Sequence, residues 1–86
     1  MIKFISFDNI VVDAAALEEK LRFVCTSVYK NGHNQFFVNY QGSCKTLYDN
    51  ITSIVGDKHV LLLGFTPEDY WGYQDKSLWT WINENK

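Results

Sequence analysis

The order of apolar patterns along the chain constrains its fold more than any other feature. Stretches whose apolar residues have the pattern of a strand alternate with stretches whose apolar residues recur every three or four positions, as in a helix. The resulting order is strand, helix, strand, helix, strand, helix. We expect the 86 residues to form a single domain, 1–86. We therefore expect an α/β fold with a small three-stranded sheet packed by three or four helices. A fourth strand, or an α+β fold with an antiparallel strand, is the alternative.

The clearest helix is expected from Ala14 to Lys30. Asp13 is a favourable N-cap, and Asn31-Gly32 supplies a stop. Apolar residues recur between them at spacings of three and four, which places them on one helical face. These residues are Ala14, Leu17, Leu21, Val24 and Val28.

Three strands are expected, at Ile2–Phe7, 35–41 and 59–65. The run Val60–Leu63 has no polar alternation, which predicts a central strand covered on both faces. Further helices are expected at Lys45–Val55, from Thr66 to about Gly72, and at Lys76–Asn83. In the last of these the spacing directs Leu78, Trp79 and Ile82 inward and Trp81 to the side.

Charge and cysteine usage narrow the functional class. The net charge is −2 and no two of the eight Lys and Arg residues are adjacent, which disfavours nucleic-acid binding. No stretch has the length of a membrane span, and the N-terminus lacks the apolar run of a signal peptide. We therefore expect a cytoplasmic protein in which Cys25 and Cys44 are reduced.

Aromatic and acidic residues crowd together in the last third of the chain. Trp and Tyr are the side chains that most often anchor protein interfaces. Because a small core cannot bury them all, some are expected to face a partner. The predicted contact residues of this segment are Glu68, Asp69, Trp71, Tyr73 and Trp81.

The sequence contains no motif of a known catalytic or metal site. It has no glycine-rich phosphate loop, no GxSxG and no HExxH, so we expect no catalytic residue, no metal and no cofactor. One alternative is a minor enzyme that uses Cys44 with His33 or His59, since Cys44 lies near a helix start. The other is a small domain that stacks single-stranded nucleic acid on its aromatic residues.

The segment Tyr40–Thr52 resembles the barstar family of intracellular ribonuclease inhibitors. The resemblance lies in a Tyr/Gly loop followed by a helix that carries Leu47-Tyr48-Asp49, and with the element order it covers about half of the chain. It implies that Tyr40, Gly42, Tyr48 and Asp49 face a nuclease, with the Asp49 carboxylate in place of a substrate phosphate.

These observations predict a small intracellular inhibitor or adaptor that occludes another protein. Immunity proteins, antitoxins and phage-encoded inhibitors of host or defence proteins fit the description equally well. Two surfaces are candidates for the contact. One is the aromatic and acidic segment near the C-terminus, and the other contains Tyr40, Tyr48 and Asp49.

Overall fold

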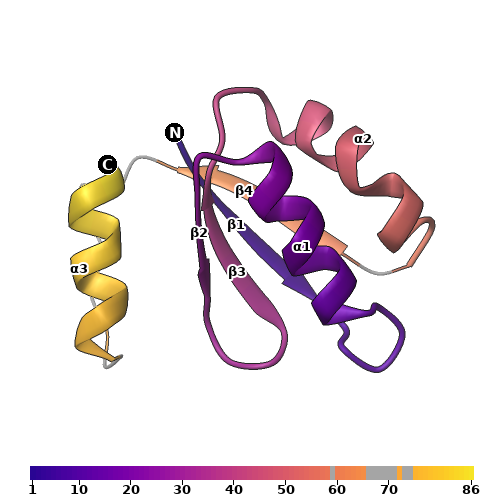
Figure 1. Ribbon diagram of the computed structural model, residues 1–86, viewed down its shortest axis with the longest axis horizontal. Coiled ribbons are helices and arrows are strands. Elements are labelled where there is room, and N and C mark those ends of the chain that lie inside the picture. The colour runs from indigo at the N-terminus through magenta and orange to yellow at the C-terminus, as the bar shows by residue number, and fades with distance from the viewer. Residues whose placement is uncertain (59, 66–71, 73–74) are drawn as a thin grey trace.

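Four strands form one antiparallel sheet in the computed structural model, which describes residues 1–58, 60–65, 72 and 75–86. The strands are β1 (Ile2–Phe7), β2 (Ser27–Lys30), β3 (Gln35–Asn39) and β4 (Val60–Phe65), in the spatial order β2-β3-β1-β4. Three helices complete the fold: α1 (Ala14–Val24), α2 (Cys44–Val55) and α3 (Lys76–Asn85). Figure 1 shows the sheet between α3 on one side and α1 and α2 on the other.

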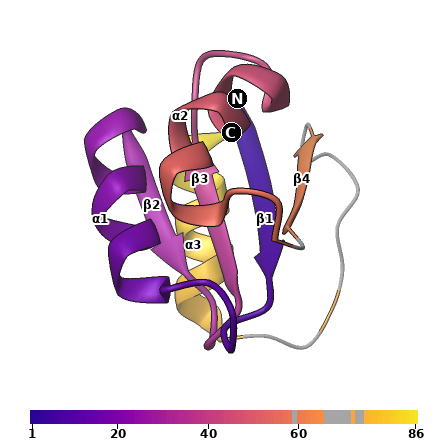
Figure 2. The same cartoon turned by 90° about the vertical axis from the view of Figure 1, so that its right-hand side faces the viewer.

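The chain crosses the sheet twice by way of a helix. The two units are β1-α1-β2 and β3-α2-β4. In the sheet, the two strands of each unit are separated by one strand of the other unit. This element order is that of the split βαβ, or ferredoxin-like, arrangement, with α3 added at its end. Both crossover helices therefore lie on the same face of the sheet, side by side (Figure 2).

Side-chain caps fix where the two crossover helices begin. The Asp13 carboxylate accepts from the backbone N–H groups of Ala15 at 3.1 Å and Ala16 at 3.2 Å. The Ser43 hydroxyl accepts from the Thr46 N–H at 3.2 Å and starts α2 in the same way. Each helix then buries one apolar stripe against the sheet, made by Leu17 and Leu21 in α1 and by Leu47, Ile51 and Val55 in α2.

The main core lies between this helical layer and the sheet. Strand residues that alternate along β1 and β3 point into it, and the Phe7 and Phe36 rings stack there with centroids 5.6 Å apart. Tyr40 and Tyr48 pack at its margin. Its buried members are Ile5, Phe7, Val12, Leu17, Leu21, Val28, Phe36, Val38, Leu47, Ile51 and Val55.

A second, smaller core lies on the opposite face, under α3. Leu78, Trp81 and Ile82 cover Ile2 there, with Tyr29, Phe37 and Trp79 at the edge. Polar contacts fix the helix in place: the hydroxyls of Tyr29 and Ser77 share a hydrogen bond of 2.6 Å. Helix α3 therefore belongs to the folded domain.

The α/β class and the element positions near 2–7, 35–39, 44–55 and 76–85 agree with the sequence prediction. The prediction of one helix from Ala14 to Lys30 is wrong, because α1 ends at Val24 and residues 27–30 form β2. Val28 fits both a helical stripe and a strand, and its burial comes from pairing with Val38 on β3. Gly32, with φ at +72°, turns the β2–β3 hairpin and does not end a helix.

The prediction that β4 is a central strand is also wrong. It pairs only with β1 among the described strands and lies at the end of the sheet. Leu61 and Leu63 point away from the helical layer and are 53% and 49% exposed. The helix predicted from Thr66 to Gly72 falls largely outside the described residues. Within the described part of the chain, no helix is long and apolar enough to cross a membrane.

Candidate functional site

A groove of about 450 Å³ runs between α1 and α2 on the side of the helical layer that faces away from the sheet. One wall is the face of α1 formed by Ala16, Glu19, Lys20 and Phe23, and the other is Ile54 of α2. Residues at spacings of three, four and seven share one face of a helix. Because Leu17 and Leu21 direct the opposite side of α1 into the core, this face is left toward solvent.

Phe23 is the most unusual residue of the groove. Its side chain is 84% exposed, although a Phe side chain gains about 2 kcal/mol or more from full burial. The Lys20 ammonium lies 5.7 Å from the centre of the ring, an exposed cation–π contact. A single exposed apolar side chain needs no explanation, but here the ring borders a concave surface that already contains Ala16 and Ile54.

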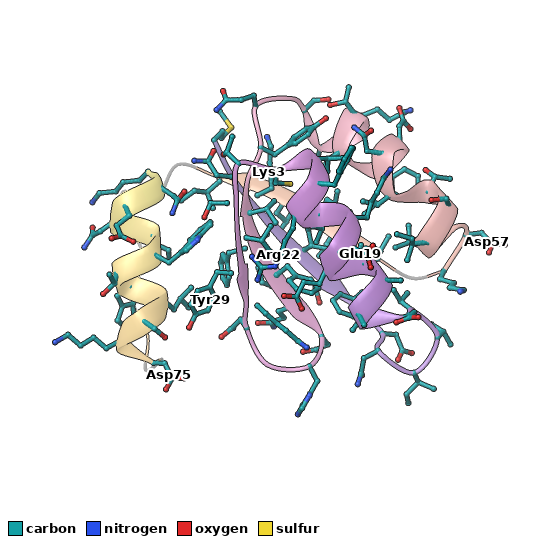
Figure 3. All side chains as sticks on the ribbon, in the orientation of Figure 1. Lys3, Glu19, Arg22, Tyr29, Asp57 and Asp75 are labelled. Carbon is teal, nitrogen blue, oxygen red and sulfur yellow. The ribbon has the colours of Figure 1, made fainter. Side chains whose placement is uncertain are left out.

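The charges around the groove are only partly paired within the chain. Glu18 and Arg22 form an ion pair at 2.8 Å, one turn apart on α1. Glu19 is exposed and forms no ion pair with any residue that the structure describes. Figure 3 labels Glu19 and Arg22 on α1. The groove therefore combines an exposed aromatic ring, the Lys20 ammonium beside that ring, and the exposed carboxylate of Glu19.

A second hollow, of about 310 Å³, lies at the end of the molecule where the β1–α1 and α2–β4 loops meet. It is lined by Asp8, Val11, Asp57 and Lys58. Ile10, beside it in the sequence, is 89% exposed. The Asp8 carboxylate accepts from the Ile10 backbone N–H at 2.9 Å, so it serves to shape its own loop. Among the described residues that line this hollow, Val11 is the one apolar side chain and none is aromatic.

The residues of the Tyr40, Tyr48 and Asp49 surface each have a partner within the chain. Tyr48 donates from its hydroxyl to the Gly56 carbonyl at 2.6 Å, which ties the side of α2 to its C-terminal end. Tyr40 donates to the Thr46 hydroxyl at 3.1 Å. Asp49 forms an exposed ion pair with Lys45 at 2.8 Å, which reduces the charge that it could present to a nuclease.

Of the predicted contact residues near the C-terminus, Glu68, Asp69, Trp71 and Tyr73 lie outside the described residues. Trp81 was expected at the side of its helix, but it is only 9% exposed and belongs to the second core. Its indole N–H donates to the Ser27 hydroxyl at 2.8 Å. The physical reason is that β2 and β3 extend beneath α3, so the buried stripe is Leu78, Trp81 and Ile82.

Cys44, the thiol considered for catalysis, is free and partly buried at the first residue of α2. Cys25 is a free, partly buried thiol, and burial raises its pKa from 9.0 to about 11, which favours the protonated form. His33 is exposed in the β2–β3 hairpin, and His59 falls outside the described residues. In the ranges that the structure covers, no three His, Cys, Asp or Glu side chains are grouped as metal ligands.

The nucleic-acid alternative predicted stacking on aromatic residues, and two such residues lie on the sheet face on the α3 side. The centroids of the Phe4 and Phe37 rings lie 5.0 Å apart on this face, on neighbouring strands. Phe37 is partly covered by the α3 core, and none of the described sheet positions on this face carries a charge. A surface without cations lacks the main source of affinity for phosphate.

No family model, curated protein or solved structure matches this chain. Sequence reasoning did not single out Phe23. The signal was present, because Phe23 falls outside the stripe that contains Leu17, Leu21 and Val24 and is the one large apolar residue on the polar side of that helix.

Proposed function

We propose that this protein is a small intracellular inhibitor or adaptor that binds another protein and catalyses no reaction. The groove between α1 and α2 is the contact surface, and the exposed Phe23 ring beside Ala16 and Ile54 is the observation that supports this most strongly. Aromatic side chains that enter a partner's pocket supply much of the binding free energy of protein interfaces. Immunity proteins, antitoxins and phage-encoded inhibitors remain the candidate classes.

The construction of the groove suits an inhibitor. Its residues lie on two capped helices whose inner faces are fixed in the main core, so the surface is rigid before a partner arrives. A rigid surface loses little conformational entropy on binding. Occlusion of a partner needs only such a surface and no catalytic group.

The barstar-like resemblance proposes a different surface, with Asp49 as its central charge. Asp49 is exposed and lies on α2, so a substitution there changes the surface and leaves the core intact. The two surfaces can therefore be compared in one experiment with single substitutions.

The experiment is affinity capture from the source cell with the full chain and three variants. Phe23→Ala removes the ring, Asp49→Ala tests the barstar-like surface, and Leu61→Ala removes a half-exposed apolar side chain from the opposite face of the sheet. All three should melt close to the wild type, because each side chain is exposed. Proteins captured by the wild type are identified by mass spectrometry and measured again as purified pairs by calorimetry.

We expect Phe23→Ala to weaken binding of the purified partner by about 30-fold or more, the cost of losing an interface anchor. Leu61→Ala should leave the affinity within about threefold of wild type. If only Asp49→Ala abolishes capture, the groove is not the contact surface. If none of the three changes capture, both surfaces are excluded.

A further inference from the structure

The α1 face of the groove is complementary to itself. Ala16 and Phe23 lie two helical turns apart, one a small residue that leaves a hollow and the other a projecting ring. Glu19 and Lys20 lie midway between them and carry opposite charges. A surface of this kind matches a second copy of itself when the two copies are related by a twofold axis.

We propose that α1 pairs antiparallel with α1 of a second copy of this chain, with the twofold axis between Glu19 and Lys20. In this arrangement Phe23 of each copy lies over Ala16 of the other. Ile54 of α2 forms the outer wall of the hollow that receives the ring. Both Phe23 rings thereby lose their exposure to water, and each enters a site of the same composition.

The same axis sets the charges in favourable positions. Glu19 of one copy lies opposite Lys20 of the other, and the contact occurs twice by symmetry. Among the residues that the structure describes, the ion pairs are Glu18–Arg22 and Lys45–Asp49, so Glu19 has no ion pair and Lys20 contacts only the Phe23 ring of its own chain. Any pairing that brought like residues together would place two carboxylates or two ammonium groups in contact, which is unfavourable.

The size of the contact predicts a weak association. Helix α1 has 11 residues, and a single pair of helices of this length buries less than the roughly 1,200 Å² of standard stable interfaces. The dimer should therefore form in the upper micromolar range and dissociate on dilution. It would occupy the same groove as the partner proposed above, so the two associations would exclude each other, but self-pairing does not depend on that partner.

Analytical ultracentrifugation of the purified full chain tests the pairing. The wild type should change from monomer to dimer as its concentration rises, and Phe23→Ala should remain monomeric over the same range. Glu19→Lys alone and Lys20→Glu alone should each weaken the dimer by about tenfold or more, because two attractive contacts become repulsive. An equimolar mixture of these two variants should dimerise again, since positions 19 and 20 are then both cationic in one chain and both anionic in the other.

The mixture is the decisive sample, because a substitution that merely damaged the fold could not be rescued by another chain. Circular dichroism of each variant checks that α1 is intact. A wild type that stays monomeric up to millimolar concentration overturns the pairing and leaves the partner experiment unaffected. A dimer that both charge reversals leave unchanged, or a mixture no more dimeric than its components, overturns it equally.

Discussion

The indole N–H of Trp81 donates to the hydroxyl of Ser27 at 2.8 Å, and this contact joins α3 to β2 across 54 positions of sequence. Trp81→Ala would leave a large cavity under α3 and should lower the free energy of unfolding by about 3–5 kcal/mol. Ser27→Ala would remove only the acceptor and should cost about 1 kcal/mol. Chemical denaturation measures both, with the exposed Thr80→Ala as control. A Trp81→Ala protein as stable as wild type would contradict the burial of this side chain.

Burial of Cys25 links its ionisation to stability at high pH. Its pKa is raised from 9.0 to about 11 in the folded protein, so the folded state keeps a proton that the unfolded state loses. The resulting contribution of Cys25 to the free energy of unfolding is fully present below about pH 9 and is lost as the pH rises through about 11. Between these values the stability of the wild type should fall more steeply than that of Cys25→Ala. The free energy of unfolding is measured by urea titration at each pH. An equal fall with pH for the two proteins would refute the linkage.

The same burial predicts the reactivity of the thiol. In a Cys44→Ala background, Cys25 should react slowly with iodoacetamide at pH 7 and faster only as the pH approaches about 11. The unfolded chain in urea serves as the reference, and its rate should rise around pH 9. Fast alkylation of the folded protein at neutral pH would instead show an accessible thiolate.

Gly32 provides a test of the β2–β3 hairpin. Its φ is +72°, and a Cβ at this position would meet no atom within 4 Å, so Gly32→Ala carries a backbone cost without a steric one. We expect a loss of about 1 kcal/mol in the free energy of unfolding, or roughly 4–8 °C in melting temperature. The neighbouring His33→Ala should have little effect, because His33 is exposed. An unchanged melting temperature for Gly32→Ala would show that this turn is not formed.

The prediction of the first helix illustrates how much local pattern can establish. Asp13 and the spacing of Leu17 and Leu21 located the start of α1 and its buried face. Its end was missed, because Val24 and Val28 continue the helical spacing while Val28 also fits the alternation of a strand. Val28 belongs to a strand because it pairs with Val38 on β3. This contact joins two segments of the chain, and the local pattern of either segment does not reveal it.

The place of β4 in the sheet, the burial of Trp81 and the groove beside Phe23 were less predictable for the same reason. The apolar run at Leu61 and Leu63 shows no alternation, so nothing in the sequence distinguishes an edge strand from a central one. Whether Trp81 is covered depends on which strands lie beneath α3. Phe23 could have been noticed from the helix alone, but the groove beside it needs Ile54, which is contributed by α2.

Hydrogen exchange of the full chain, free and bound to the purified partner, tests the central claim most directly. If the groove is the contact surface, added protection should be found in α1 and in the last turn of α2, which carries Ile54. The amides of β4 and α3 should exchange as they do in the free protein. Protection confined to β4 and α3, with α1 unchanged, would contradict the account.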